Sequence, residues 1–258
     1  MNLKDKVAIV TGASSGVGYA IAETLAKNGT NLVLAARSFD KLKEFADDFS
    51  SNYGIKTIPI KTDLTIINDI INLFEKTKKE FGRLDLLINV AGIFPEISFV
   101  KSTTEQFIAS YNNSRALMLD AVIYTTKLGL DLLLKNKGII INISSDAGLE
   151  KKVYPNQVPY HAAKAGVNHA TRAIDLEIKN LGSRAFAIAP GNIDTPLLRK
   201  AIAENSNLIS LIEKKVGSLE LFYSKILKPK DIANKVIDII NNTKKYKNSV
   251  IEMESYEF

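Results

Sequence analysis

The chain has 258 residues, of which 46% are hydrophobic and 24% charged, and its net charge is +6. This composition is that of a globular protein, and it excludes intrinsic disorder, which requires few apolar residues and a high net charge. The absence of cysteine excludes disulfide scaffolds, thiolate zinc sites and cysteine nucleophiles, and two histidines are too few for a histidine-rich metal centre. No apolar run approaches the roughly 18 residues of a membrane span. We therefore expect a soluble cytoplasmic protein without a signal peptide, which binds neither a membrane nor a metal ion.

The basic residues are mostly lysines and are scattered, with the densest group between residues 225 and 247. No aromatic residues alternate with these lysines at the spacing of a base-stacking surface. The pattern favours a solvated helix face, and we expect no nucleic-acid partner.

Short apolar segments typical of buried strands alternate with longer segments of helical periodicity almost throughout the chain. The strands are expected at residues 6–10, 31–36, 57–61, 84–90, 138–144 and 184–189, and a last apolar segment at 249–253 could close the sheet. Alternation of this kind, with nearly continuous apolar strands, predicts a doubly wound α/β fold. Its parallel, Rossmann-like sheet would have about seven strands, with helices on both faces.

Two segments interrupt this alternation. Residues 103–135 form one long helical pattern, and Thr103 with Gln106 has the spacing of a capping box at its start. Residues 194–228 are rich in leucine and isoleucine and have no strand before them. Because ligands bind at the carboxyl edge of such sheets, we interpret this second segment as a substrate lid. Residues 1–258 are expected to form a single dinucleotide-binding and catalytic domain.

A glycine-rich turn joins the first strand to the first helix and contains Gly12, Gly16 and Gly18. Glycine is required where a turn is tight and where the backbone must approach a pyrophosphate. The helix that follows offers free N–H groups and a positive dipole to phosphates. The turn therefore favours a dinucleotide site.

The order of short motifs resembles that of the short-chain dehydrogenase/reductase family, in the single-domain branch with TGxxxGxG and YxxxK motifs. The resemblance is carried by Thr11–Gly18, Asp63-Leu64, Asn89–Gly92, Ser144-Ser145, Tyr160–Lys164 and Pro190–Thr195, and it covers roughly residues 5 to 198. The cofactor-binding residues that it implies are Gly12, Ser14, Ser15, Gly16, Val17, Gly18, Arg37, Ser38, Asp63, Leu64, Asn89, Ala91, Gly92, Tyr160, Lys164, Pro190, Gly191, Ile193 and Thr195.

Tyr160 and Lys164 are four residues apart on a predicted helix, so they share one face. A lysine ammonium beside a tyrosine favours the phenolate and lowers its pKa. The resemblance implies that Tyr160 exchanges a proton with the substrate oxygen and that Lys164 also holds the nicotinamide ribose. It implies that Ser145, with Ser144 as the alternative, hydrogen-bonds the substrate oxygen.

The fourth catalytic residue of the family is an asparagine in the helix after the fourth strand. Counting forward from Asn89 reaches Asn113 or Ser114, whereas counting backward from Gly138 reaches Met118. We assign Asn113 to this role, with Asn112 and Ser114 as alternatives.

The end of the second strand indicates which dinucleotide is bound. A site for NAD places a carboxylate there to accept a hydrogen bond from the ribose, but this chain has Ala36 followed by Arg37. An arginine can pair with the 2′-phosphate of NADP. A second basic residue common in the family is replaced by Ser15. The sequence therefore predicts NADP(H).

The substrate is less clear from the sequence. Ser145, Tyr160, Phe94 and Tyr154 are expected to contact it, and Val153, Leu197 and Leu198 suggest a mostly apolar pocket. His161 is expected to point away along its helix. Residues 250–254 resemble the hydroxy-acid dehydrogenase branch more than the 3-oxoacyl-carrier-protein reductases.

The resulting prediction is an NADP-dependent enzyme (EC 1.1.1.-) that transfers hydride between the nicotinamide and a small carbonyl or secondary alcohol substrate. The alternatives are a catalytically silent dinucleotide sensor and a 3-oxoacyl-carrier-protein reductase; a methyltransferase would have no use for the Tyr/Lys pair. Apolar residues such as Leu128, Leu130 and Leu132–Leu134 predict a homodimer or homotetramer built on helices at 112–134 and 160–181.

Overall fold

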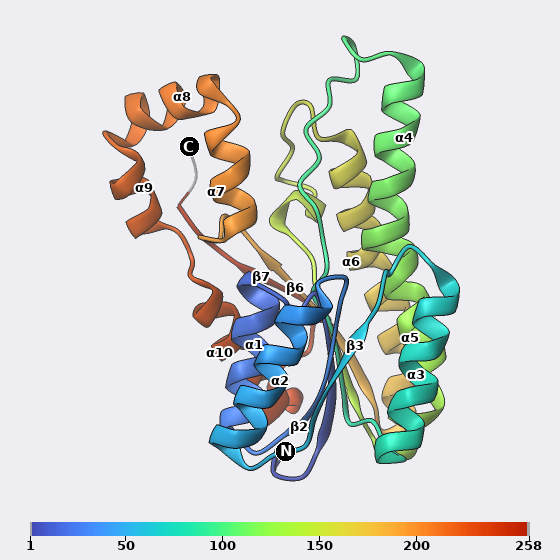
Figure 1. The fold of residues 1–258 in the computed structure, drawn as a ribbon. Helices are drawn as coiled ribbons and strands as arrows, with labels where there is room; N and C mark the ends of the chain where they lie inside the picture. Colours follow the sequence, from blue (N-terminus) through green and yellow to red (C-terminus); the bar gives the residue numbers. More distant parts are fainter. Residues whose placement is uncertain (1, 257–258) are drawn as a thin grey trace.

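The computed structural model describes residues 2–256, and its centre is a seven-stranded parallel sheet with the order β3-β2-β1-β4-β5-β6-β7 (Figure 1). The strands are β1 (Val7–Thr11), β2 (Asn31–Ala36), β3 (Thr57–Lys61), β4 (Leu86–Asn89), β5 (Ile139–Ile143), β6 (Arg184–Pro190) and β7 (Val250–Met253). The predicted doubly wound fold is confirmed, and the last apolar segment does close the sheet by pairing with β6.

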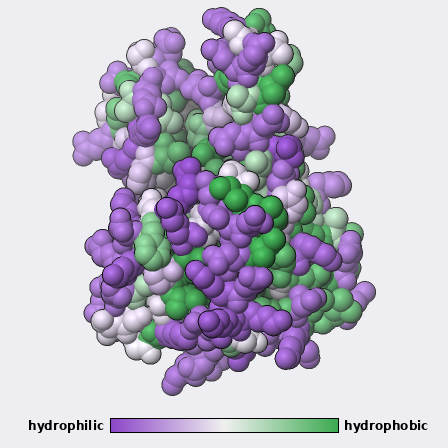
Figure 2. Space-filling model, turned by 45° about the vertical axis from the view of Figure 1, so that its right-hand side comes forward, coloured by the Kyte–Doolittle hydropathy of each residue, from purple (hydrophilic) through white to green (hydrophobic). Residues whose placement is uncertain are grey.

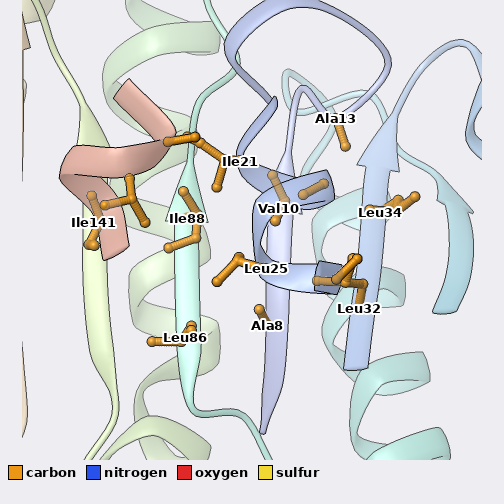
Figure 3. Close-up of a cluster of buried hydrophobic side chains, with 14 of the residues drawn as sticks. Ala8, Val10, Ala13, Ile21, Leu25, Leu32, Leu34, Leu86, Ile88 and Ile141 are labelled. Carbon is orange, nitrogen blue, oxygen red and sulfur yellow. The ribbon is translucent and has the colours of Figure 1, made fainter. Parts of the chain in front are cut away.

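Helices cover both faces of the sheet because successive residues of each strand point to opposite sides. In β1, Ala8 and Val10 pack on one side with α1 (Gly16–Lys27), α2 (Phe39–Tyr53) and α10 (Pro229–Asn241). Ile9 packs on the other side with α3 (Ile67–Phe81), α5 (Ala121–Lys135) and α6 (Val158–Ile178). Figure 3 shows the first of these interfaces, in which Ile21 and Leu25 of α1 meet the side chains of the central strands.

The chain changes direction across the sheet at β1, which pairs with β2 on one side and β4 on the other. At such a switch point the loops after the two neighbouring strands diverge and leave a crevice at the carboxyl ends of the strands. The glycine-rich turn follows β1 into this crevice.

The long helical pattern is two helices joined by a π-helical turn: α4 (Thr104–Arg115), the turn Ala116–Asp120, and α5. The predicted capping box is present, since Thr103 accepts from the Gln106 N–H and Gln106 accepts from the Thr103 N–H. Leu133 is fully buried, and Leu130, Leu132 and Leu134 pack against the core of the same subunit. Most of the leucines that suggested an interface therefore belong to the core.

Residues 194–228 form α7 (Pro196–Ala203), α8 (Ser206–Val216) and α9 (Leu219–Lys225), which lie beyond the carboxyl edge of the sheet (Figure 1). They share a small core of their own, made by Ile202, Ile212, Val216, Phe222 and Ile226. Short 3₁₀ turns occur at Asp146–Gly148, Lys179–Leu181 and Thr243–Lys245. No helix within residues 2–256 is long and apolar enough to span a membrane.

Candidate active site

A cavity of about 660 Å³ runs along the carboxyl ends of the strands, from the glycine-rich turn to α7 and α8. Figure 2 shows hydrophobic residues gathered below the notch between the two upper lobes of the molecule, on a face that is otherwise mostly hydrophilic. All but two of the residues assigned to catalysis, to the cofactor or to direct substrate contact line this cavity. They are Gly12, Ser14, Ser15, Gly16, Val17, Gly18, Arg37, Ser38, Asp63, Leu64, Ala91, Gly92, Phe94, Ser145, Tyr154, Tyr160, Lys164, Pro190, Gly191, Ile193 and Thr195.

The glycine-rich turn forms a floor of bare backbone at one end of the cavity. Gly12 and Gly16 have φ angles of +64° and +54°, a region that residues with a side chain rarely adopt. A Cβ on Gly18 would lie 2.2 Å from the Gly12 carbonyl oxygen. The N-terminus of α1 begins here, and its N-cap Ser15 makes no side-chain hydrogen bond to the helix. Backbone N–H groups of α1 are therefore left for an anionic ligand.

The end of β2 brings Ala36, Arg37 and Ser38 to the same end of the cavity. Arg37 is exposed and lies close enough to Asp63 for its charge to help lower the pKa of that carboxyl, after the larger effect of hydrogen bonds from Thr65. At this end of the cavity, β2 therefore ends in Ala36 and not in a carboxylate, and the cation of Arg37 follows it.

Asn89, expected to contact a cofactor, lies behind the cavity and does not line it. Its amide donates to the Asn142 Oδ1 at 2.9 Å and its Oδ1 accepts from the Thr125 hydroxyl. Asn142 in turn donates to Thr171. This buried network joins β4 and β5 to α5 and α6, so Asn89 holds the ends of the central strands together.

Ser145, Tyr160 and Lys164 meet in the middle of the cavity. Ser145 follows β5, and its hydroxyl lies close enough to the Tyr160 phenol to lower the pKa of that phenol, against the larger effect of burial. The Ser144 hydroxyl donates to the Lys164 carbonyl, which makes Ser145 the better candidate of the two. The Lys164 Nζ donates to the Ile143 carbonyl at 2.9 Å and lies 5.7 Å from the centre of the Tyr160 ring.

Burial is the main cause of the pKa shifts of Tyr160 and Lys164. It raises the pKa of Tyr160 to about 12, with a smaller contribution from the Asp146 charge, and lowers the pKa of Lys164 to about 8. The pKa of Tyr160 is therefore raised, and not lowered as we expected, because the loss of hydration penalises the phenolate. At neutral pH this arrangement holds a protonated phenol beside an ammonium group.

Asn113 is exposed on α4 and does not line the cavity, so its assignment as the fourth catalytic residue is not supported. Ser114 is buried and donates to the Ser110 carbonyl. The cavity is lined at this level by Leu117, and the Met118 sulfur lies beside Gly92. The π-helical turn lies between Asn113 and Gly138, so it affects only the backward count, which reached Met118.

The substrate end of the cavity is formed by rings and by the apolar faces of α7 and α8. The Phe94 and Tyr160 rings meet edge to face, with centres 5.4 Å apart. Leu197 and Leu198 line the cavity as expected, whereas Val153 is 77% exposed and does not. The predicted apolar pocket is therefore present in part, alongside polar groups.

His161, which we expected to point away from Tyr160 along its helix, makes hydrogen bonds to two backbone groups. Its Nε2 accepts from the Tyr154 N–H at 3.0 Å, so its Nδ1 carries the proton that is donated to the Ala147 carbonyl. The ring therefore connects the loop that carries Tyr154 to the turn that follows Ser145.

Among the cavity residues that were not found from the sequence are Asp146, Glu96 and Asn205. Asp146 is 8% exposed and accepts a hydrogen bond from the Ser145 hydroxyl at 3.0 Å. Glu96, in the loop after β4, accepts from the Asn205 amide of the lid at 3.0 and 3.1 Å. Asp146 could have been found because it directly follows the serine pair, but nothing in the sequence links Glu96 to Asn205. Within residues 2–256 no cluster of acidic residues and histidines could hold a metal ion.

Known proteins resemble this chain in sequence and in fold. The family model described as "short chain dehydrogenase" matches residues 6–206. An uncharacterized oxidoreductase of Staphylococcus saprophyticus is 36% identical over 198 residues, which are 76% of this chain and 82% of that protein. Glycine betaine reductase ATRR of Emericella nidulans is 33% identical over 235 residues, which are 91% of this chain but only 17% of that much longer protein.

Two solved structures share the fold over almost the whole chain. One is an alcohol dehydrogenase from the archaeon Thermococcus sibiricus complexed with 5-hydroxy-NADP, with a TM-score of 0.79, 24% identity, and coverage of 99% of this chain and 100% of that one. The other, gox2181, has a TM-score of 0.83, 24% identity, and coverage of 98% of this chain and 96% of that one.

Proposed function

Because this chain belongs to the short-chain dehydrogenase family, we propose that it is an NADP(H)-dependent oxidoreductase (EC 1.1.1.-) acting on a small carbonyl compound or secondary alcohol. The observation that carries the proposal is that one cavity contains both the glycine-rich backbone floor and the Ser145, Tyr160 and Lys164 side chains. A binding protein would need only the first of these features.

The residues present suit a dinucleotide. The floor at Gly12, Gly16 and Gly18 has no side chains, so a pyrophosphate can approach the backbone and the N-terminus of α1. The cavity continues from there to Lys164 and Tyr160. These two residues would hold the nicotinamide ribose and face the reacting carbon.

NADP is favoured over NAD because Ala36 and Arg37 occupy the end of β2. The arginine would pair with the 2′-phosphate, and no β2 carboxylate repels it. Asp63 on the neighbouring loop would keep the guanidinium at the mouth of the cavity. One neighbour in fold is itself complexed with an NADP derivative.

The bound nicotinamide supplies or accepts the hydride, and the side chains of this chain handle the oxygen. Ser145 would turn its hydroxyl from Asp146 to the carbonyl oxygen, donate a hydrogen bond to it and align it with the Tyr160 hydroxyl. As the carbonyl carbon is reduced, its oxygen becomes a strong base and takes the proton from Tyr160. The nearby Lys164 ammonium then stabilises the phenolate. Since the Tyr160 pKa is about 12, the phenol is protonated at neutral pH, which suits carbonyl reduction better than alcohol oxidation.

We also propose that the enzyme is a homodimer or homotetramer. The support is an exposed apolar set on α5 and α6, consisting of Ile123, Tyr124, Leu128 and Leu176, with exposed fractions between 38% and 62%. Light scattering at micromolar concentration tests this, and a mass of one 28.4 kDa chain would contradict it.

The test of the function is NADPH oxidation by the purified protein with a panel of aldehydes and ketones. Tyr160→Phe keeps the ring but removes the proton donor, so turnover should fall by about 10²- to 10⁴-fold while NADPH still binds. Tyr111→Phe, on an exposed face of α4 and outside this apolar set, is the matched control and should leave turnover unchanged.

Two outcomes would contradict the proposal. Background rates with every carbonyl, despite tight NADPH binding, would favour a dinucleotide sensor. Normal turnover by Tyr160→Phe would exclude the proton transfer that we assign to it. Selective reduction of 3-oxoacyl thioesters would instead identify the carrier-protein reductase.

A further inference from the structure

The carboxylate of Asp146 lies at the substrate end of the cavity and has no part in the proton transfer described above. We propose that it recognises a positive charge on the substrate, so that the enzyme acts on a small carbonyl compound, or the corresponding alcohol, that carries a cationic nitrogen. This inference rests on the proposed function and identifies the class of substrate.

Asp146 is nearly inaccessible to water, with 8% of its surface exposed, although it lines the cavity. Its Oδ1 accepts from the Ser145 hydroxyl. A charge placed in such surroundings is costly unless an opposite charge approaches it. Burial raises the pKa of Asp146, and hydrogen bonds from Ser145 and the Ala147 N–H only partly offset this effect. Smaller contributions of opposite sign come from Lys152 and Glu252, neither of which lines the cavity. A cation in the cavity would complete the compensation.

Aromatic rings surround the same space. The charge of Asp146 helps to raise the pKa of both Tyr154 and Tyr160, after the larger effect of burial, so it lies near both phenols. Phe94 packs edge to face on Tyr160. Tyr154 is held by His161 through its backbone N–H. A carboxylate beside aromatic side chains is a suitable environment for an alkylated ammonium group.

The charges along the cavity are unequally distributed, although the chain as a whole has a net charge of +6. Among the charged residues between 2 and 256 that line it, Arg37 and Asp63 lie at the cofactor end. The Lys164 ammonium is bound to the Ile143 carbonyl beneath Tyr160. Asp146 and Glu96 remain for the substrate, with Glu96 exposed at the mouth. This end of the cavity therefore attracts cations and repels phosphates and carboxylates.

The position of Asp146 also limits where the positive charge can be. Its Oδ1 is 3.0 Å from the Ser145 hydroxyl that would hold the substrate oxygen. The nitrogen must therefore be only a few bonds from the carbonyl carbon. Hydride from NADPH adds to that carbon and the Tyr160 proton to its oxygen, which gives the alcohol and NADP⁺ with the nitrogen unchanged.

A pair of aldehydes of the same shape provides the test: trimethylammonioacetaldehyde and 3,3-dimethylbutanal, which has carbon in place of the charged nitrogen. We expect the wild-type enzyme to prefer the cationic aldehyde in kcat/KM by about 10- to 100-fold. Asp146→Asn keeps the shape and an acceptor for Ser145 but removes the charge, so the preference should fall by about tenfold or more. Each aldehyde is hydrated in water to the same extent in both assays. Its hydration therefore cancels when the preference of Asp146→Asn is compared with that of the wild-type enzyme.

Glu252→Gln is the matched control, because it removes a carboxylate that acts on Asp146 from outside the cavity. It should leave the preference unchanged, and NADPH affinity reports the folding of each variant. The inference is overturned if the neutral aldehyde is reduced equally well, if neither aldehyde is accepted while another neutral carbonyl is, or if both variants change the preference alike. If no carbonyl compound of any charge is reduced, it is the proposed function itself that fails.

Discussion

The cofactor end and the substrate end of the cavity are built from different parts of the chain. The cofactor end consists largely of backbone: a glycine-rich turn, a helix N-terminus and the ends of β1 and β2. The substrate end consists of side chains from the loop after β4, the segment after β5 and the lid helices, which hold one another through Glu96 with Asn205 and His161 with Tyr154.

The fold fixes the shape of the cofactor end, whereas a few substitutions can change the substrate end. A dinucleotide is the same molecule in every enzyme that uses it, so a backbone cradle of fixed shape is sufficient. A substrate is recognised by side chains whose loops can change without disturbing the sheet. A substitution that damages one end of the cavity should therefore leave binding at the other end unchanged.

The largest effect is expected for Gly18→Ala, which damages the cofactor end. The added Cβ would lie 2.2 Å from the Gly12 carbonyl oxygen, so the turn must move away from the pyrophosphate. NADPH should bind about 100-fold more weakly, or worse, in a fluorescence titration.

Gly82→Ala is the control for this change. It also replaces a glycine of positive φ but meets no atom within 4 Å, so it should lower the unfolding free energy by about 1 kcal/mol and leave NADPH affinity unchanged. Equal losses of affinity in the two variants would mean that the turn does not hold the cofactor.

The second prediction concerns Lys164, which lies where the two ends meet. Burial lowers its pKa from 10.5 to about 8 in the folded protein. Between these values the unfolded chain holds a proton that the folded protein has lost, so stability rises with pH. Relative to Lys164→Met, the wild-type protein without cofactor should gain roughly 3 kcal/mol of unfolding free energy between pH 8 and 10.5. Urea unfolding of both proteins measures this, and a constant difference would show that the ammonium is not destabilised by burial.

The third prediction concerns the choice of cofactor. Arg37→Ala removes one charge-assisted pair with the 2′-phosphate, which is worth roughly 1.5–3 kcal/mol, or about 10- to 100-fold in the Kd of NADPH. NADH has no such phosphate, so its affinity should hardly change. Arg172→Ala, at an exposed position on α6, should affect neither cofactor. Equal binding of NADH and NADPH by the wild-type protein would contradict the assignment of Arg37.

The difference between the cofactor end and the substrate end also explains which features could be predicted from the sequence. The positions of the strands and the cofactor end follow from sequence because buried strands and glycine turns are local patterns, and each motif directly follows its strand. Every predicted cofactor residue lines the cavity except Asn89, whose side chain turns into a buried network instead. A motif gives the position of such a residue but not the direction of its side chain.

The substrate end could be predicted less well for two physical reasons. Contacts between distant segments, such as Glu96 with Asn205, depend on packing that has no local signal. The choice of Asn113 depended on a count from Asn89 through the irregular segment between β4 and α4, which has no fixed spacing. The pKa of Tyr160 followed burial, which a motif does not report.

The smallest effect is expected at the contact between Glu96 and the lid. Asn205→Asp keeps the oxygen that accepts the Leu208 N–H at the start of α8 but removes the amide that donates to Glu96. Two carboxylates would then face each other, so the lid should close less well. Because the pair is exposed, the cost should be about 0.5–1 kcal/mol, seen as a two- to fivefold rise in KM for a neutral aldehyde.

A second substitution sharpens this last prediction. In the double variant with Glu96→Gln, donor and acceptor exchange places, because the new amide can donate to the new carboxylate. KM should return toward the wild-type value, while the NADPH Kd should be the same in the wild-type protein and both variants, since the contact lies far from the glycine-rich turn. If KM does not recover in the double variant, the contact does not hold the lid over the substrate. If NADPH affinity falls together with KM, the two ends of the cavity are coupled, and the separation argued above is wrong.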